Sequence, residues 1–136
     1  MPKHFPGHDI YIWLDADLWV QDATVLDIFA RAAGRRKLAI AAEYDRAYKQ
    51  AYKRGKLFGW THNHKHYRLS FGWRVADRYG KMPILNSGAF SLRAESPFWE
   101  AWAINLQKAL NRSRHPLMEQ TSMNLEIYRD FGNATV

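Results

Sequence analysis

Two apolar runs and a helical pattern between them dominate the first third of the chain. Ile10 to Asp15 and Leu38 to Glu43 read as buried strands, because their apolar residues do not alternate with polar ones. Ala23 to Ala33 has the apolar spacing of a helix, with Asp22 as its N-cap and Gly34 at its end. Strand, helix and strand in this order predict a βαβ unit, and therefore a parallel or mixed α/β sheet.

The middle of the chain predicts a helix followed by a histidine-rich loop. DRAYKQAYKRGK has tyrosines at helical spacing and Asp45 as its N-cap, whereas FGWTHNHKHYR has no steady period and predicts a loop. The alternating histidines of His62 to His66 would share one face of an extended strand and could bind Zn²⁺ or Ni²⁺ there. The basic residues around them favour a solvated loop instead.

The last third of the chain predicts strands and then two helices. Ile84 to Ala94 has the composition of two strands separated by a break at Asn86 to Gly88. Ser96 and Pro97 have the residue types of an N-cap and a first helical position, so a helix is expected over PFWEAWAINLQKALNR, from Pro97 to Arg112. A final helix is expected from Met118 to Arg129.

The composition predicts one soluble, globular domain spanning residues 1–136. Hydrophobic residues make up 47% and aromatic residues 15%, too apolar for disorder and too interrupted by charge for a transmembrane segment. With no leader pattern and no cysteine, a cytoplasmic location is expected. Trp99 and Trp102, three residues apart, are expected in the core, while Trp60 and Trp73 fit either the core or a surface that stacks on a sugar.

The chain is strongly basic, with 20 Lys and Arg against 13 Asp and Glu and a net charge of +7. Such a surface attracts polyanions in general, so nucleic acid, anionic lipid, phosphorylated glycans and nucleotides are all admissible partners. The charge alone does not choose among them, because it is spread over several segments rather than gathered in one arm.

Asp15 and Asp17 follow directly on the first predicted strand. Side chains alternate between the two faces of a strand, so both carboxylates would point to one site. Hard oxygen ligands suit Mg²⁺ or Mn²⁺, and ligands of open α/β sheets bind beyond the carboxyl ends of the strands. The pair therefore predicts a metal site for a diphosphate, although a solvated turn capped by Asp17 fits the same residues.

Three segments in order along the chain, WLDADLWVQ, LNSGAF and EQTSMN, resemble motifs of metal-dependent glycosyltransferases of the GT-A fold. The resemblance is closest to the retaining family 8 type, in which they correspond to the DxD strand, the sugar-contacting turn and an acid-Gln segment that begins a helix. It implies an α/β fold with a mixed sheet flanked by helices.

The resemblance also implies a reaction and a cofactor. The enzyme would transfer a hexosyl group from a nucleotide-sugar, expected to be a UDP-sugar, to a carbohydrate acceptor. Asp15 and Asp17 would hold Mn²⁺ or Mg²⁺ against the donor diphosphate, where the metal stabilises the departing nucleoside diphosphate.

The second and third motifs would bind the transferred sugar. By the resemblance, Asn86, Ser87 and Gly88 line the donor-sugar pocket, with Gly88 allowing close approach of the backbone. Glu119 and Gln120 would be the catalytic residues, near an anomeric carbon that becomes oxocarbenium-like. Without the resemblance, these segments would be read as a tight turn and as an ordinary acidic first turn of a helix.

Two parts of the family pattern have no counterpart here. Only nine residues precede Ile10, where family members carry a nucleotide-binding βαβ region, and no histidine follows the last predicted helix to act as a further metal ligand. We therefore expect the central and C-terminal part of a GT-A domain, truncated at both ends and weakly active by itself. Apolar surface left uncovered would favour a homo-oligomer.

Two other functions fit parts of the sequence. A phosphohydrolase of the haloacid dehalogenase type also has four hydrophobic residues followed by Asp-x-Asp, and uses the first acid as nucleophile. That pattern has Thr or Val two residues after the second acid, where this chain has Trp19. A non-catalytic nucleic-acid-binding module would explain the basic charge and interleaved aromatics. It leaves the two acids after the first strand without a role, and the sequence has no recognisable nucleic-acid-binding signature, so no nucleic-acid partner is expected.

Overall fold

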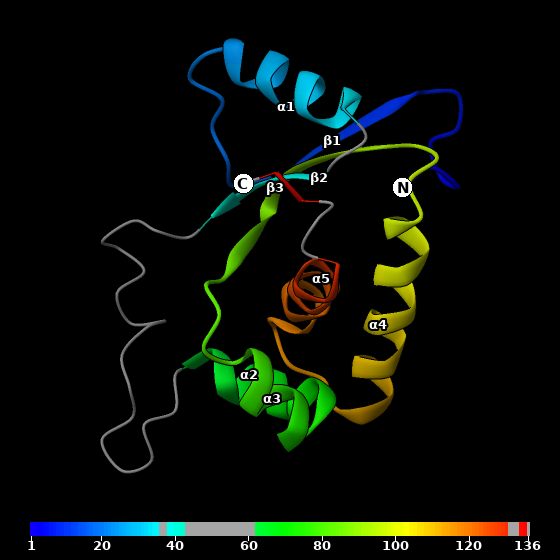
Figure 1. Ribbon diagram of the computed structural model, residues 1–136. Helices are drawn as coiled ribbons and strands as arrows, with labels where there is room; N and C mark the ends of the chain where they lie inside the picture. Colours follow the sequence, from blue (N-terminus) through cyan, green and yellow to red (C-terminus); the bar gives the residue numbers. More distant parts are fainter. Residues whose placement is uncertain (36–37, 43–61, 131–133, 136) are drawn as a thin grey trace.

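The protein has a mixed α/β architecture with helices on both faces of one sheet (Figure 1). The computed structural model describes residues 1–35, 38–42, 62–130 and 134–135. The strands of this part are β1 (Ile10–Leu14), β2 (Leu38–Ala42), β3 (Leu85–Arg93) and β4 (Ala134–Thr135). Its helices are α1 (Thr24–Gly34), α2 (His62–Phe71), α3 (Trp73–Tyr79), α4 (Phe98–Arg112) and α5 (Met118–Arg129).

The sheet is mixed, as predicted, but its strand order differs from that of a simple βαβ unit. The spatial order is β1-β3-β2-β4, with β3 antiparallel to both β1 and β2, and with β2 parallel to β4. β1 and β2 therefore run in the same direction and are joined through α1, but they are not neighbours. A strand that comes later in the chain pairs between them, which the local pattern of β1, α1 and β2 does not encode.

The predicted break at Asn86 to Gly88 is wrong, because β3 runs without interruption from Leu85 to Arg93. The pairing of β3 with β2, however, is irregular at these residues. Ile40 pairs with Phe90, whereas the next residue, Ala41, pairs with Asn86. The intervening residues of β3 thus have no partner on β2, and this distorted stretch contains Ser87 and Gly88 of the predicted sugar-contacting turn.

The main core lies between the sheet and the helices α4 and α5. Seven buried apolar side chains from β2, β3 and α5 form it: Leu38, Ile40, Leu85, Phe90, Leu92, Met123 and Ile127. Trp99 and Trp102 of α4 pack against this cluster from the side, so their predicted core position is confirmed in part. On the opposite face, the Ser91 hydroxyl of β3 donates a hydrogen bond of 2.6 Å to the Phe29 carbonyl of α1.

The capping residues that the sequence offers contact the first turns of two helices. The N-cap of α1 is Ala23 rather than the predicted Asp22, although the amide and the hydroxyl of Thr24 both donate to Asp22 Oδ1, at 2.8 and 2.7 Å. The Phe98 amide donates to Ser96 Oγ at 3.3 Å at the start of α4. α5 has the predicted bounds. None of the described helices combines the length and apolarity needed to cross a membrane.

The predicted histidine-rich loop is wrong, because its described part belongs to helix α2. Its inward-facing residues include Asn63, His64, His66 and Ser70, which are all buried. A helix that buries polar residues shows no apolar period, which explains why the pattern was missed. α3 follows directly and was not predicted either, while the helix expected from Asp45 lies outside the described residues.

Candidate functional site

The acidic pair follows the end of β1 in a turn rather than on the strand itself. β1 ends at Leu14, and the Leu18 amide donates to the Asp15 carbonyl at 3.0 Å to close the turn that contains Asp17. Strand alternation therefore does not apply at Asp17, and the argument that it points both carboxylates to one site is wrong for this residue. Both side chains are exposed, and their assignment as metal ligands stays a prediction.

Asp15 lies against the distorted stretch of β3. Its amide donates to the Gly88 carbonyl at 2.8 Å, and its Oδ1 accepts a hydrogen bond of 2.7 Å from Trp13 Nε1. A Cβ atom at Gly88 would lie 2.9 Å from Asp15 Oδ2 and 2.8 Å from Asn86 Oδ1. A side chain at this position would therefore displace the Asp15 carboxylate and the Asn86 amide oxygen, so the first two motifs meet at this glycine.

The backbone at Gly88 is fixed by its neighbour in the motif. The Gly88 amide donates to Asn86 Oδ1 at 2.6 Å, so the Asn86 side chain folds back over the strand. Its amide oxygen and the Asp15 carboxylate are both hard oxygen donors that approach the same glycine. The arrangement gathers two of the oxygen ligands that a magnesium or manganese ion prefers.

The third motif joins the site through Glu119 in the first turn of α5. The buried hydroxyl of Ser87 donates to Glu119 Oε2 at 2.8 Å, a contact between residues 32 positions apart. Burial raises the pKa of the Glu119 carboxyl, the negative charge of Asp15 raises it further, and the Ser87 hydrogen bond opposes the shift. Glu119 is therefore a carboxyl group that loses its proton at a higher pH than an ordinary glutamate, and it lies beside the acidic turn.

A buried amide fixes α5 against β3 and so places Glu119. Asn124 Oδ1 accepts from the Leu85 amide at 2.8 Å, and its Nδ2 donates to the Leu85 carbonyl, also at 2.8 Å. The same Nδ2 donates to the Gln120 carbonyl at 2.9 Å within the helix. Leu85 comes two residues before Ser87 on β3. These two hydrogen bonds between the helix and the strand therefore set the register of the Ser87–Glu119 contact.

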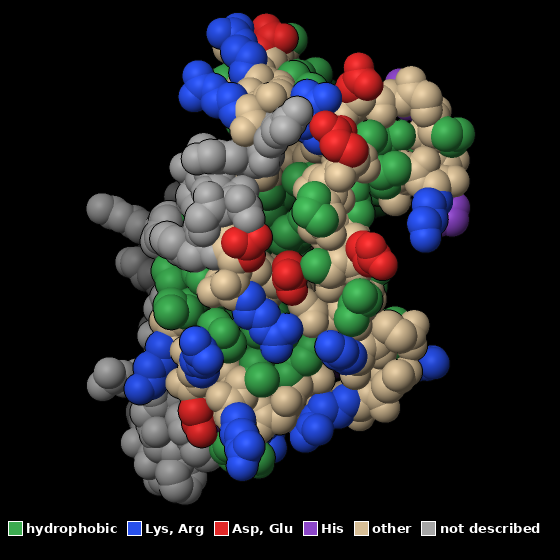
Figure 2. Space-filling view, turned by 45° about the vertical axis from the view of Figure 1, so that its right-hand side comes forward, with side chains coloured by type: hydrophobic (Ala, Val, Ile, Leu, Met, Phe, Trp, Pro, Cys, Tyr) green, Lys and Arg blue, Asp and Glu red, His purple; other side chains and the backbone are tan. Residues whose placement is uncertain are grey.

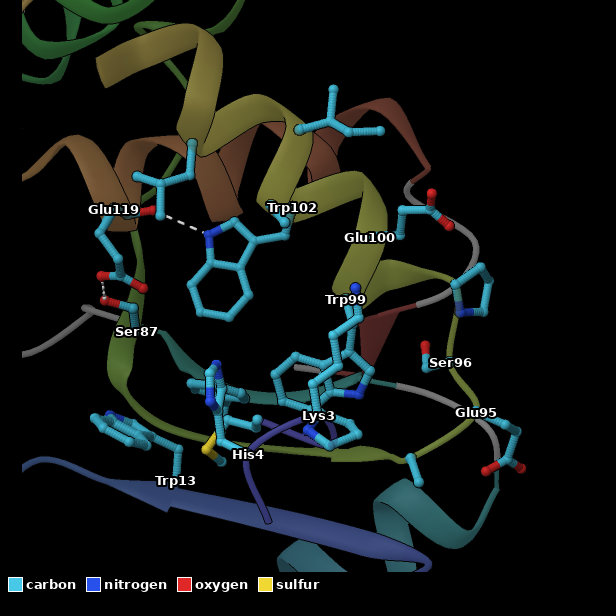
Figure 3. Close-up of a pocket in the computed structure, with 18 of the residues that line it drawn as sticks. Lys3, His4, Trp13, Ser87, Glu95, Ser96, Trp99, Glu100, Trp102 and Glu119 are labelled. Atoms are coloured by element: carbon cyan, nitrogen blue, oxygen red, sulfur yellow. Dashed lines mark hydrogen bonds between the residues drawn. The ribbon is translucent and has the colours of Figure 1, made fainter. Parts of the chain in front are cut away.

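A pocket of about 1260 Å³ opens between β1, β3, α4 and the N-terminal residues. Its wall carries four aromatic side chains: Trp13, Phe90, Trp99 and Trp102. Figure 3 shows the Trp99 and Trp102 rings projecting from α4, with the Ser87–Glu119 contact to one side. Trp102 Nε1 donates to the Glu119 carbonyl at 3.3 Å, which links the aromatic wall to the carboxyl residue.

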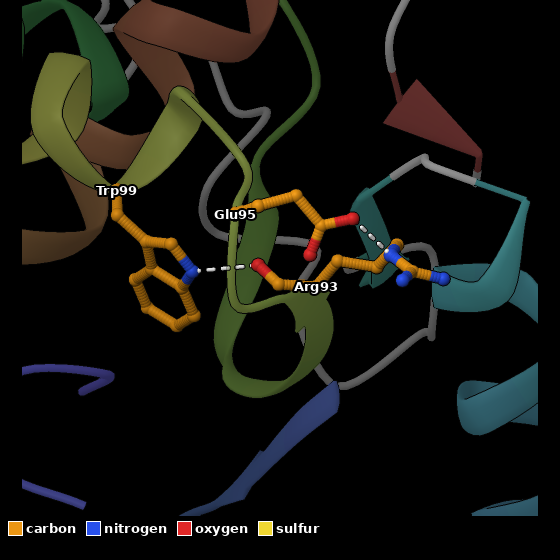
Figure 4. A network of polar contacts seen from close by, with 3 residues as sticks. All are labelled: Arg93, Glu95 and Trp99. Carbon is orange, nitrogen blue, oxygen red and sulfur yellow. Dashed lines mark hydrogen bonds and ion pairs between the residues drawn. The ribbon is translucent and has the colours of Figure 1, made fainter. Parts of the chain in front are cut away.

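The pocket is acidic although the whole chain is basic. Asp15, Glu95, Glu100 and Glu119 line it together with Lys3 and His4. Glu95 forms an ion pair with Arg93, and the Arg93 carbonyl accepts a hydrogen bond of 2.9 Å from Trp99 Nε1 (Figure 4). This network orients the Trp99 ring toward the pocket.

The structure brings only some of the predicted site residues to the pocket. Asp15, Ser87 and Glu119 line it, whereas Asp17, Asn86, Gly88 and Gln120 do not. Gln120 is half-buried in the first turn of α5. Trp13 was missed, and the signal for it was its position two residues before Asp15, which puts both on the same side at the end of β1. Trp73 lies elsewhere, under the Arg68 guanidinium at 4.8 Å, and Trp60 is outside the described residues.

The donor atoms fit a divalent ion only in part. Among the described residues, no group of three or more His, Asp or Glu side chains is arranged to hold a metal. In the same part of the chain, neither Asp15 nor Asp17 forms an ion pair, and of the two only Asp15 lies beside the Asn86 amide oxygen. Two acids and an amide suit Mg²⁺ or Mn²⁺ when water and phosphate oxygens complete the coordination.

Comparison of the chain with models of known protein families, with curated protein sequences and with solved structures finds no match in any of the three. The resemblance of the three motifs to GT-A glycosyltransferases therefore stays a prediction.

Proposed function

We propose that this chain is a metal-dependent glycosyltransferase domain of the GT-A type, similar to the retaining family 8 enzymes. The observation that carries the proposal is the convergence of three motifs from distant parts of the sequence. Asp15 approaches Gly88, and Ser87 of the same turn donates to Glu119. A chance match to three short motifs would have no reason to bring them into contact around one acidic pocket.

The acidic turn would bind the donor diphosphate through a cation. Asp15 and Asp17 would hold Mn²⁺ or Mg²⁺, with Asn86 Oδ1 as the neighbouring neutral oxygen. When bound, the ion would offset the negative charge of the departing nucleoside diphosphate. Trp13 would keep the Asp15 carboxylate in place, because its indole donates to Asp15 Oδ1.

Glu119 and Gln120 would lie beside the transferred sugar as the catalytic residues. The Ser87 hydroxyl holds one oxygen of Glu119, while burial and Asp15 favour the protonated form. A carboxyl of this kind accepts or donates hydrogen bonds with sugar hydroxyls, and when ionised it stabilises a positive anomeric centre. In this proposal, Ser87 would contact the donor sugar from the pocket wall, with Asn86 and Gly88 of the same stretch of β3 beside it.

The aromatic wall would serve the sugar rings. Trp13, Trp99 and Trp102 offer apolar faces on which the hydrogen-rich face of a pyranose can pack, with carboxylates nearby to accept from its hydroxyls. The pocket thus suits a neutral hexosyl group and a carbohydrate acceptor. A UDP-sugar is the proposed donor, and a cytoplasmic location and a homo-oligomeric state belong to the same proposal.

A thermal-shift experiment on the purified chain tests the proposal. Mn²⁺ with inorganic pyrophosphate probes the diphosphate site alone, and Mn²⁺ with a UDP-hexose adds the sugar. Ligands that bind the folded state raise the unfolding midpoint, so both mixtures should raise it and the UDP-hexose should raise it more. Asp15→Asn or Asp17→Asn should abolish the rise, while Asp27→Asn, an exposed acid on α1, should leave it unchanged.

The same experiment separates the rival functions. A rise with a short oligonucleotide and none with the Mn²⁺ mixtures would contradict the transferase and favour a nucleic-acid-binding module. Turnover of an aryl phosphate that is lost in Asp15→Asn would favour a haloacid dehalogenase-like phosphohydrolase. A midpoint that rises equally in the parent chain and in Asp15→Asn would show that the acidic turn is not the binding site.

A further inference from the structure

The histidine-rich helix α2 carries a second cluster that the proposed transferase does not use. His66 and Ser70 are four residues apart in α2 and therefore lie on the same side of the helix. His115, from the segment between α4 and α5, meets both of them. None of the three lines the aromatic pocket, so the cluster is separate from the candidate transferase site.

The imidazole rings of His66 and His115 face each other with their Nδ1 atoms. His66 Nδ1 and His115 Nδ1 are 3.3 Å apart, and the ring centroids are 5.1 Å apart at an interplanar angle of 38°. Ser70 Oγ lies 2.8 Å from the other ring nitrogen of His115, Nε2. His66 is 9% exposed and Ser70 is 1% exposed, whereas His115 is only partly buried, so solvent reaches the cluster from the His115 side.

The separation of the two nitrogens fits metal chelation as well as a hydrogen bond. Imidazole nitrogens bind Zn²⁺ at about 2.0–2.1 Å, so two of them on a tetrahedral ion stand about 3.3–3.4 Å apart. The observed distance of 3.3 Å between the two Nδ1 atoms matches this spacing.

Ser70 occupies the position of an outer partner that orients a metal-binding histidine. If the Ser70 oxygen accepts the Nε2 proton of His115, the lone pair of His115 is left on Nδ1, the atom that faces His66. Burial lowers the pKa of His115, and the nearby charge of Lys65 lowers it further. Both effects favour the neutral imidazole, the form that binds metal ions.

We propose that His66 and His115 form a two-histidine site for a borderline transition-metal ion such as Zn²⁺ or Ni²⁺, with Ser70 as the positioning residue and solvent completing the coordination. This inference does not rest on the transferase. His64 of the same helix is not part of the site, because its Nε2 pairs with Asp77 Oδ1 at 2.9 Å.

Zinc titration of the untagged chain, followed by two-bond ¹H–¹⁵N spectra of the histidine rings, tests the site. The Nδ1 resonances of His66 and His115 should shift together and saturate at one equivalent of Zn²⁺. Nδ1 resonances that do not move would overturn the proposal and assign the pair to an ordinary hydrogen bond. This readout uses the parent chain, so it does not depend on how well a variant folds.

Calorimetric titration with Zn²⁺ gives the second readout, in an Asp15→Asn, Asp17→Asn background that removes the other candidate metal site. His115→Gln should abolish binding at the His66 site, and Ser70→Ala should weaken the affinity roughly 10–100-fold. His8→Gln, an exposed histidine near the N-terminus, is the matched control and should bind as the background does. Equal affinity in His115→Gln and His8→Gln would contradict the site.

Discussion

At the scale of single residues, the acidic turn depends on one glycine. Gly88 has the Asp15 carboxylate and the Asn86 amide oxygen within 3 Å of where a Cβ atom would lie, at 2.9 and 2.8 Å. Any side chain there would push the two oxygens away from the strand. The residue therefore controls whether the first two motifs can share one ligand.

Glu119→Gln tests the electrostatics of the site. Because the folded chain raises the pKa of this carboxyl above its ordinary 4.5, the folded state binds more protons than the unfolded state above that pH. The parent chain therefore loses stability as the pH rises from below 4.5 toward and through the raised pKa. The glutamine variant, which cannot ionise, should gain free energy of unfolding relative to the parent over the same range.

Chemical denaturation at several pH values measures this difference. Glu100→Gln, on the exposed side of α4, controls for the general loss of one negative charge near the pocket. A difference between Glu119→Gln and the parent that stays constant with pH would show that Glu119 ionises as freely in the folded chain as in the unfolded one.

Tyr67→Phe tests a buried hydroxyl in a second, smaller core cluster, in which Tyr67 packs with Ala76, Tyr79 and Leu125. Tyr67 is 1% exposed, and its hydroxyl has no hydrogen-bond partner in the described part of the chain. Leaving such a group unpaired costs about 1–3 kcal/mol, so phenylalanine should raise the free energy of unfolding by about 1 kcal/mol. Tyr128→Phe should have the opposite sign, because its hydroxyl donates to the Pro83 carbonyl. Urea titrations of both variants decide the matter, and a loss of stability in Tyr67→Phe would contradict the account.

At the scale of elements, the contact between α5 and β3 holds the site together. Asn124→Ala would leave both the amide and the carbonyl of Leu85 without their partner, so we expect a loss of about 2–4 kcal/mol of stability. Asn111→Ala, in an exposed part of α4, should change stability by less than about 0.5 kcal/mol. Similar losses in the two variants, measured by urea titration, would show that the Asn124 amide does not fix the helix to the strand.

The elements that could be predicted are those whose sequence signals are local. β1, β2, α1, α4 and α5 end within about two residues of their predicted bounds, because polar residues at helix starts, such as Asp22, and apolar runs act over short distances. α2 was missed because it buries Asn63, His64 and His66 rather than apolar residues. The place of β3 between β1 and β2 is a long-range pairing, which no local pattern encodes.

For the candidate site, the residues could be predicted from local motifs, but their contacts could not. The residue types of its three motifs, and a metal role for Asp15, could be proposed from sequence, but the contacts among them could not. The Ser87–Glu119 hydrogen bond depends on the packing of α5 on β3. The aromatic wall depends on α4 lying over the pocket, so Trp99 and Trp102, expected only in the core, also line a cavity.

At the scale of the whole molecule, the charges are unevenly distributed. Figure 2 shows many Lys and Arg side chains over the lower half of this face, with Asp and Glu side chains mainly above them and further Lys and Arg side chains at the top. The pocket itself carries Asp15, Glu95, Glu100 and Glu119 against Met1, Lys3 and His4, and Glu95 is paired with Arg93. A diphosphate entering this pocket meets like charge, so the net charge of +7 does not by itself attract the donor to the site.

Under the proposed function, this distribution predicts that donor binding requires a metal ion. In the presence of a chelator, calorimetric titration should detect no binding of a UDP-hexose to the pocket, even at low ionic strength, and added Mn²⁺ should restore it. Sodium chloride should have a smaller effect than the chelator, because the ion at Asp15, rather than the basic surface, would hold the diphosphate. Donor binding that persists with the chelator and disappears with salt would show that the basic surface, rather than the acidic turn, binds the donor.

Paramagnetic broadening of backbone amide signals by Mn²⁺, recorded with a nucleoside diphosphate present, tests the central claim most directly. The account predicts that broadening is centred on Asp15, Asp17 and Gly88, extends to Ser87 and Glu119, and disappears in Asp15→Asn. Broadening centred elsewhere, or equally strong in Asp15→Asn, would contradict it.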